Sequence, residues 1–183
     1  MSQPYQHRRG GGERRAAPPL NGPALERLAL RYVERFATTR GRLAAYLVRK
    51  IRERGWEGEA ADPAALAERL AGLGYIDDRA FAETRATAMS RRGLGQRRVS
   101  GALRAAGIDA EDAAAVAPGI EARSLEAAMT FARRRRIGPY AQEPADRPLR
   151  EKQVAAMIRG GHDFELSRKI VNLSPGEALE YYE

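Results

Sequence analysis

The 183-residue sequence contains no cysteine and no long run of apolar residues. Without cysteine the chain can form neither a disulfide bond nor a thiolate metal site, which fits a reducing compartment. A helix that crosses a bilayer needs about 20 predominantly apolar residues, and a secretory signal peptide needs an apolar segment near the N-terminus. The sequence shows neither feature, so we expect a cytoplasmic protein that does not associate with membranes.

Lysine is also scarce, because arginine supplies almost all of the positive charge. The formal net charge is +8, and the lysines are Lys50, Lys152 and Lys169 alone. A guanidinium group can donate two hydrogen bonds at once to a phosphate or a carboxylate. A GC-rich genome, however, encodes arginine where another genome would encode lysine. The composition by itself therefore indicates only an acidic partner of some kind.

Helix-forming patterns run through most of the chain. Apolar residues recur at the spacing of one helical face, as Val99 and Leu103 do, and no segment keeps up a period-two alternation. The predicted fold class is therefore all-α. An alanine-rich helix is expected to begin after Asp109, a plausible cap, and to end at Pro118 and Gly119.

A repeated helix end indicates tandem modules. Gly55, Gly107 and Gly161 each end a predicted helix, and they lie 52 and 54 residues apart. Spacing of this kind is typical of an array of similar units, each here of three helices. The N-terminal residues are basic and rich in glycine and proline, a composition that favours disorder. The predicted organisation is a disordered basic tail at 1–22 and three-helix modules at 23–74, 75–121 and 122–183.

Residues suited to catalysis are few. His7 lies in the tail, and His162 stands where the other repeats have Trp56 and Ile108. We therefore interpret His162 as a packing or turn residue. No glycine-rich phosphate loop follows a strand, and no spacing of histidines or paired carboxylates indicates a metal site. The sequence predicts a protein that is not an enzyme and that needs no cofactor or metal.

The stretch 72–108 reads as two helices joined by a glycine turn. Asp77 and Asp78 can accept hydrogen bonds from the first turn of a helix, so we predict that they act as its cap. Tyr75 is predicted to pack this turn against the core. The predicted structural residues of this motif are Gly74, Tyr75, Asp77, Asp78, Phe81, Gly93 and Gly107.

Arginines dominate the same stretch. From Arg85 to Arg104 there are six arginines and no carboxylate, so no ion pair between successive turns offsets the repulsion of like charges. An anionic partner explains such a face better than solvation does. A second run, Arg133 to Arg136, points all round a helix and is equally compatible with partner contact and with solvation. The candidate partner- or DNA-binding residues are Arg85, Arg91, Arg92, Arg97, Arg98, Arg104, Arg133, Arg134, Arg135 and Arg136.

Two motifs carry a family resemblance. They read Leu73-Gly74-Tyr75-Ile76-Asp77-Asp78-Arg79-Ala80-Phe81-Ala82 and Arg92-Gly93-Leu94-Gly95-Gln96-Arg97-Arg98-Val99, and Leu103-Arg104-Ala105-Ala106-Gly107-Ile108 follows them. In type, order and spacing they resemble the RecX family of recombination regulators, over roughly residues 24–173. The resemblance implies a tandem repeat of three three-helix modules in an elongated curved array. It also implies a monomeric regulator in homologous recombination, DNA repair and the SOS response that binds RecA recombinase filaments on DNA and modulates, usually inhibits, them.

Three functional hypotheses follow. In the first, the array lies along a RecA filament and its arginines reach single- or double-stranded DNA within or beside the filament. In the second, the chain is an independent DNA-binding protein, because two helices joined by a glycine turn superficially resemble a helix-turn-helix. In the third, it is a helical-repeat scaffold for acidic proteins. The resemblance favours the first hypothesis.

Overall fold

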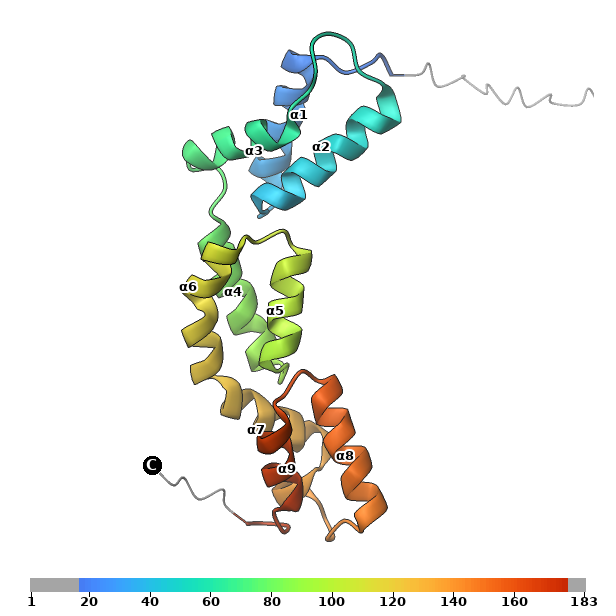
Figure 1. Ribbon diagram of the computed structural model, residues 1–183, viewed down its shortest axis with the longest axis vertical. Coiled ribbons are helices and arrows are strands. Elements are labelled where there is room, and N and C mark those ends of the chain that lie inside the picture. The colour runs from blue at the N-terminus through green and yellow to red at the C-terminus, as the bar shows by residue number, and fades with distance from the viewer. Residues whose placement is uncertain (1–16, 178–183) are drawn as a thin grey trace, which may run out of the picture.

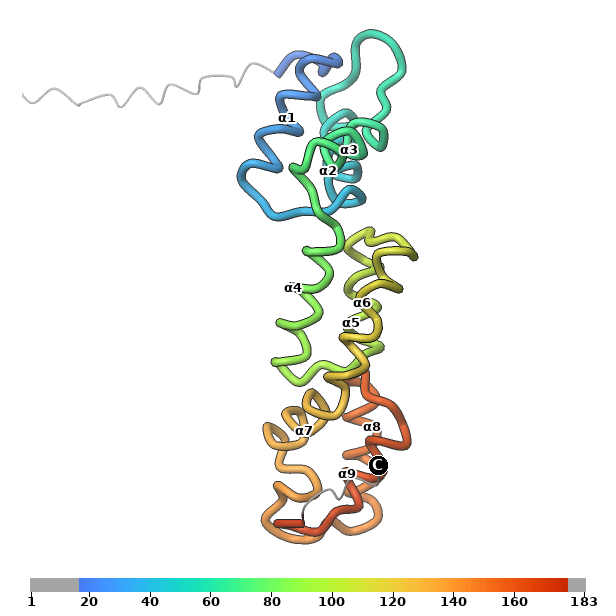
Figure 2. Tube along the Cα trace, turned by 90° about the vertical axis from the view of Figure 1, so that its left-hand side faces the viewer, coloured from blue at the N-terminus to red at the C-terminus, as the bar shows by residue number. Residues whose placement is uncertain are grey.

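The computed structural model describes residues 17–177, and this part of the chain folds into nine α-helices and one short 3-10 helix. Figures 1 and 2 show the helices in three groups that follow one another along a long, curved molecule. The helices are α1 (Gly22–Arg35), α2 (Arg40–Arg54), α3 (Pro63–Gly72), α4 (Asp78–Arg91), α5 (Gln96–Ala105), α6 (Ala110–Ala122), α7 (Ser124–Arg135), η1 (Gly138–Tyr140), α8 (Arg147–Arg159) and α9 (Phe164–Asn172). The all-α, three-module fold class is confirmed.

Each module has its own hydrophobic core. Module 1 (α1–α3), module 2 (α4–α6) and module 3 (α7–α9) each bury one apolar cluster, so most packing energy is local to a module. Large, fully buried side chains in these clusters are Leu43, Leu47 and Leu70 in module 1, Val99 and Leu103 in module 2, and Met157 and Ile170 in module 3.

Local capping explains where most helices begin. Seven of the nine α-helices open at an Asn, Thr or Asp whose side-chain oxygen accepts a hydrogen bond from a backbone N–H of the first turn. Helix α7 follows α6 almost directly, and the residue that precedes α5, Gly95, has no side chain to cap it. The free N–H groups of α5 must therefore find partners elsewhere.

Those partners are carbonyl groups of module 3. The Gly95 N–H donates to the carbonyl of Gly160 (3.0 Å), and the Arg97 N–H donates to the carbonyl of Gly161 (3.1 Å). These two carbonyls lie at the end of α8, where acceptors are unpaired. A Cβ added at Gly95 would overlap the backbone of Gly161. The glycines thus let the end of α8 dock directly onto the start of α5.

Modules 1 and 2 meet in a similar way. The Thr39 hydroxyl, which caps α2, donates to the carbonyl of Ala106 at the end of α5. A Cβ added at Gly41 would lie 2.8 Å from the Cα of Gly107. The start of α2, the second helix of module 1, therefore rests on the end of α5, the second helix of module 2. The regular spacing of the glycines reflects this contact between modules.

The predicted tail ends too late. Leu20 is buried (1% exposed), and its backbone bridges Gly55 and Glu57 at the end of α2. Leu20 therefore covers the end of α2, the place where another module would otherwise dock. The physical reason is that one leucine in a basic, glycine- and proline-rich segment is enough to anchor it when an apolar site is open. The rest of the predicted tail, residues 1–16, lies outside the described residues.

Two further predictions were wrong. Tyr75 is 52% exposed, and its neighbour Ile76 (5% exposed) packs into the core of module 1 instead. Helix α6 continues through Pro118 to Ala122. Pro118 has no N–H group to donate to the carbonyl of Ala114, four residues earlier. Both residues are exposed, so water can donate to that carbonyl instead. Buried residues on the opposite side of α6 hold the helix in place.

We predict opposite effects for two glycine substitutions near and within α5. Gly95→Ala should lower the free energy of unfolding by about 1–3 kcal/mol, because the new methyl group has no space at the α5–α8 junction. Gly101→Ala should raise it by about 0.5–1 kcal/mol, because a Cβ at Gly101 meets nothing within 4 Å and alanine favours a helix. Urea denaturation of both variants measures this. Equal effects would show that the junction is not tightly packed.

Candidate partner-binding surface

The candidate arginines fall into exposed and half-buried positions. Arg85, in the middle of α4, is half-buried, and its Nε is buried with no hydrogen-bond acceptor in the described structure. The other nine side chains are exposed. They lie at the end of α4 (Arg91, Arg92), along α5 (Arg97, Arg98, Arg104) and at the end of α7 (Arg133, Arg134, Arg135, Arg136).

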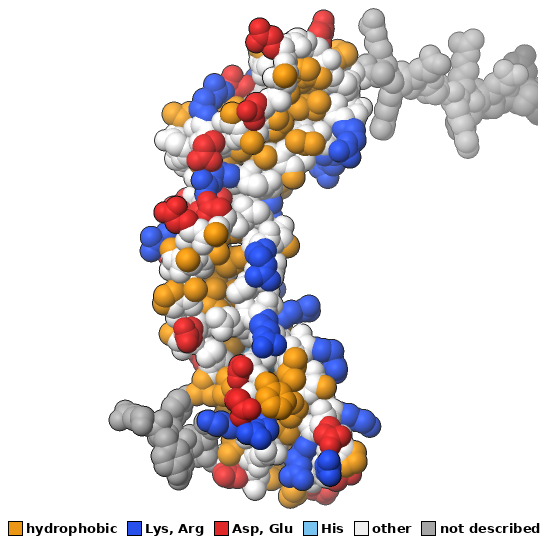
Figure 3. Space-filling view, viewed as in Figure 1, with side chains coloured by type: hydrophobic (Ala, Val, Ile, Leu, Met, Phe, Trp, Pro, Cys, Tyr) orange, Lys and Arg blue, Asp and Glu red, His pale blue; other side chains and the backbone are white. Residues whose placement is uncertain are grey.

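A contact between modules joins two of these groups. The Arg134 guanidinium donates to the backbone carbonyl of Arg92 (2.9 Å), so the end of α7 lies beside the turn between α4 and α5. On α5, Arg97 and Arg104 are seven residues apart and share one face. Figure 3 shows Lys and Arg side chains gathered along the side of the molecule that α5 and α8 form. We call Arg91, Arg92, Arg97, Arg98, Arg104 and Arg134 the arginine surface.

The other arginines of the second run are partly engaged within module 3. Arg133 lies over the Tyr140 ring (5.0 Å), and Arg135 lies over the Phe131 ring (5.3 Å). Arg136 ends α7 in the left-handed conformation, with φ of 54°. The structure therefore brings Arg134 to the arginine surface but turns Arg133 and Arg135 toward aromatic rings of their own module.

The arginine surface has no carboxylate partners within the described residues. Ion pairs elsewhere in residues 17–177 involve other cations, among them Arg40, Arg69 and Arg147. The Leu166 N–H, which donates a hydrogen bond to Asp163, is the main cause that lowers the pKa of Asp163, and the charge of Arg97 adds a smaller effect. Unpaired guanidinium groups on one face give a positive potential that attracts an anionic partner.

Arg40 is a connecting residue that the sequence did not reveal. Its backbone N–H (2.9 Å) and its Nε (3.0 Å) both donate to the carboxylate of Asp78, which is buried at the start of α4. Its guanidinium also binds Glu68 (3.1 Å), Asp109 (2.6 Å) and Asp112 (2.9 Å). Hydrogen bonding to Asp78 raises the pKa of Arg40 further above its ordinary value. One side chain thus ties α2 and α3 to α4 and α6.

This network corrects the interpretation of the two aspartates. Asp77 caps α4, because its side chain accepts from the Ala80 N–H (2.8 Å). Asp78 does not cap the helix but receives Arg40 from module 1. The two aspartates have different roles because adjacent side chains at the start of a helix point in different directions.

His162 lies at the junction of modules 2 and 3. It is 2% exposed, its ring meets Phe131 edge-on, and its Nε2 lies 3.1 Å from the carbonyl of Gly93. A carbonyl only accepts, so Nε2 carries the proton and donates. Gly93 itself packs against the backbone of Phe131. The packing role predicted for His162 agrees with these contacts.

Burial at this junction makes stability depend on pH. Burial lowers the pKa of His162, and the acceptor at Gly93 offsets this only in part. The folded protein therefore binds this proton less readily than the unfolded chain does. Its contribution to stability should be complete above about pH 6.5 and should be lost as the pH falls below that value.

Urea denaturation at pH 8 and pH 5.5 measures this effect. His162→Gln keeps a donor for the Gly93 carbonyl but does not titrate. We expect the parent protein to lose more stability between the two pH values than the variant does. An equal loss in both proteins would contradict the assignment to His162.

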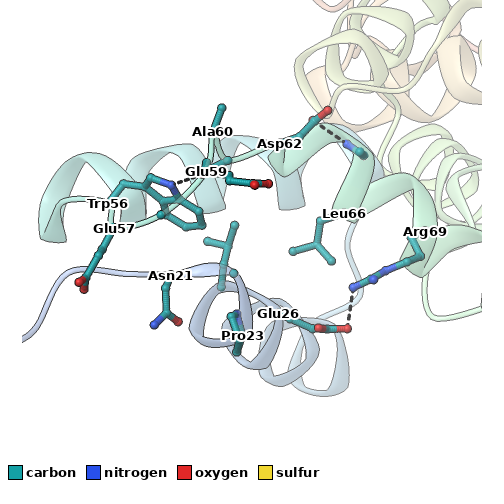
Figure 4. Close-up of a pocket in the computed structure, with 15 residues that line it drawn as sticks. Asn21, Pro23, Glu26, Trp56, Glu57, Glu59, Ala60, Asp62, Leu66 and Arg69 are labelled. Atoms are coloured by element: carbon teal, nitrogen blue, oxygen red, sulfur yellow. Dashed lines mark hydrogen bonds and ion pairs between the residues drawn. The ribbon is translucent and has the colours of Figure 1, made fainter.

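Module 1 contains an open pocket of about 640 Å³ between the starts of α1 and α3 (Figure 4). Its polar groups already serve the fold: Asn21 and Asp62 cap the two helices, and the Trp56 Nε1 donates to the Glu59 carbonyl (2.6 Å). Glu26 and Arg69 at its edge form an ion pair (2.6 Å). These groups hold the helix ends in place, and none of the candidate arginines lines the pocket.

Two other kinds of site are absent from the described part of the chain. Between residues 17 and 177, no cluster of three or more His, Asp or Glu side chains is arranged to hold a metal ion. None of the helices in that range is sufficiently long and apolar to span a membrane. The arginine surface is the candidate functional site, because its guanidinium groups are exposed and have no carboxylate partner within residues 17–177.

A curved array of three-helix modules that meet through helix ends, with unpaired arginines along one side, defines the class of tandem helical-repeat proteins. Comparisons with known proteins identify the family within that class. The family model for the second three-helix domain of RecX matches residues 77–116.

Relatives match over most of the chain. The regulatory protein RecX of Myxococcus xanthus (strain DK1622) is 32% identical over 160 residues, which cover 82% of this chain and 86% of that protein. The regulatory protein RecX of Agrobacterium fabrum (strain C58 / ATCC 33970) is 30% identical, with 82% and 83% covered. The crystal structure of RecX from Lactobacillus salivarius has the same fold, with a TM-score of 0.61 at 20% identity over 81% of this chain and 93% of that one. The chain belongs to the RecX family of regulatory proteins.

Proposed function

We propose that this protein binds RecA recombinase filaments on DNA and lowers their ATPase and recombination activity. The observation that carries the proposal is the arginine surface, which lacks carboxylate partners in the described structure and belongs to a RecX-family chain. A filament on DNA offers such a surface both phosphates and acidic side chains. Guanidinium groups bind both, through paired hydrogen bonds.

The shape of the molecule fits an extended partner. Three modules in one curved row can contact neighbouring subunits of a repeating filament at the same time (Figures 1 and 2). The Arg40 network and the α5–α8 junction fix the modules relative to one another, so less ordering entropy is lost on binding. A rigid bridge between subunits slows hydrolysis if it binds one arrangement of the filament more tightly than the others.

The protein is a regulator in this proposal and turns over no substrate of its own. It acts as a monomer, and its effect on RecA follows from binding alone. Its relatives are named regulatory proteins, which supports this view.

Following ATP hydrolysis by RecA on single-stranded DNA tests the proposal. Addition of the full chain, at saturating concentration and moderate salt, should lower the rate of hydrolysis by the RecA of the same organism. The chain alone should hydrolyse no ATP. An unchanged rate would contradict the proposal. Complete relief of inhibition by excess naked single-stranded DNA would favour the alternative of an independent DNA-binding protein.

A further inference from the structure

A second surface, on module 1, carries a row of aromatic rings. The rings of Tyr46 and Tyr32 stack with centroids 4.3 Å apart and an interplanar angle of 26°. The Phe36 ring follows at 5.2 Å from Tyr32, tilted by 51°. The row therefore runs from the middle of α2 across α1 to the residue that ends α1.

Cations flank this row at both of its ends. Arg35 lies over the Phe36 ring (5.5 Å), and Arg49 lies over the Tyr46 ring (5.6 Å). Arg42, four residues before Tyr46 on α2, lies over the Phe81 ring of module 2 instead (5.2 Å). Arg49 is paired with Glu53 (3.6 Å), whereas Arg35 has no carboxylate within ion-pair distance in residues 17–177. A guanidinium group without a carboxylate partner in the described residues thus stands at the Phe36 end of the row.

The outer ring is open to solvent. Phe36 is 49% exposed, whereas Tyr32 and Tyr46 are half-buried and pack on the core of module 1. The core itself is filled by residues such as Leu25 and Leu43 and does not need Phe36. An exposed ring at the end of a supported aromatic row, beside an arginine without an ion pair in the described residues, offers what an unstacked base and its phosphate bind: a flat apolar face and a cation.

We propose that this surface, formed by Tyr32, Arg35, Phe36 and Tyr46, is a base-stacking site for single-stranded nucleic acid. A base displaces the Arg35 guanidinium from the exposed Phe36 ring, stacks there and extends the aromatic row, and Arg35 then contacts the neighbouring phosphate. A duplex cannot bind in this way, because its bases already stack on one another. The arginine surface of modules 2 and 3 differs, since the aromatic rings beside it, Phe131 and Tyr140, are half-buried. The proposal concerns free nucleic acid and does not depend on RecA.

An oligonucleotide that lacks bases separates stacking from charge. Fluorescence anisotropy would measure binding of the full chain to labelled oligothymidylate and to an abasic strand of the same length and charge. The parent should prefer the strand with bases. Phe36→Ala should weaken binding to oligothymidylate about 10-fold, within the range lost with one base–aromatic stack, and should leave the abasic strand unaffected.

The chain offers a matched control at the opposite end. Phe164, at the start of α9, is 48% exposed, nearly the same as Phe36. Phe164→Ala should bind both strands as the parent does. Phe36→Leu, which keeps an apolar side chain of similar bulk without a ring, should behave like Phe36→Ala, so a folding defect in one variant does not decide the result.

Three results would overturn the proposal. The parent could show no preference for the strand with bases, both Phe36 variants could bind oligothymidylate as the parent does, or both could lose affinity equally for the two strands. RecA is absent from these measurements. Failure here would therefore leave the ATPase result unchanged, and failure of the RecA proposal would leave this one unchanged.

Discussion

Leu103→Ala should lower the free energy of unfolding by about 2–5 kcal/mol, the largest stability effect expected in module 2. Leu103 is 1% exposed, lies in the last turn of α5, and belongs to the same buried cluster as Val99 and Ile120 of α6. Removing its side chain loses burial and leaves a cavity, because the ends of α5 are held by contacts with the neighbouring modules and cannot collapse inward.

Arg104→Ala is the matched control for Leu103. Its side chain is the next along α5 and is exposed. Its loss should change stability by no more than about 0.5 kcal/mol. Denaturant unfolding of both variants measures the difference. Equal stabilities would show that the assignment of the buried and exposed faces of α5 is wrong.

Helices could be predicted from the sequence because their signals are local. Asp62 followed by Pro63 marks the start of α3, and the side chain of Asp62 does accept a hydrogen bond from the Ala65 N–H (2.9 Å). Apolar spacing likewise identified Val99 and Leu103 as the buried face of α5. Each signal lies within a few residues of the element it defines, so one sequence suffices.

Contacts between modules could not be predicted in the same way. Arg40 reaches carboxylates that lie 28 to 72 positions further along the chain, and no local pattern marks it out. The repeated glycines were recognised as helix ends. That Gly95 and Gly161 allow one helix end to dock on the next became visible only in three dimensions. The same holds for the contact that joins Arg134 to the rest of the arginine surface.

The prediction that Tyr75 packs against the core was wrong by one residue, and the error has a structural cause. The turn after α3 passes through Gly74 with a φ of 82°, and the chain then directs Ile76, not Tyr75, into the core. Either residue is large and apolar enough to fill the site. Periodicity cannot choose between neighbours once a glycine interrupts the helix.

The strongest functional effect is expected for the arginine surface. Arg97, Arg98 and Arg104 on α5 are exposed and have no ion-pair partner in the described structure. Replacing all three by alanine should leave helicity and melting nearly unchanged. Binding to RecA filaments on single-stranded DNA should weaken by about 100-fold, since each hydrogen-bonded charge contributes on the order of 1 kcal/mol or more.

Net charge alone must be excluded as the cause. Arg79, Arg147 and Arg168 are also exposed, but each forms an ion pair with a glutamate on its own helix (3.3, 3.1 and 2.8 Å). Replacing these three by alanine removes the same charge from other faces. This control variant should bind filaments within a few-fold of the parent protein.

Filament affinity measured over a range of salt concentrations tests the proposed role of the arginine surface most directly. The α5 triple variant should bind weakly, and each phosphate contact it has lost should flatten the slope of log affinity against log salt by about 0.7. Its loss of affinity should be larger on the filament than on naked DNA, whereas a protein that binds only DNA would lose the same on both. If the α5 triple variant binds filaments as tightly as the parent, the arginine surface is merely solvated and takes no part in filament binding.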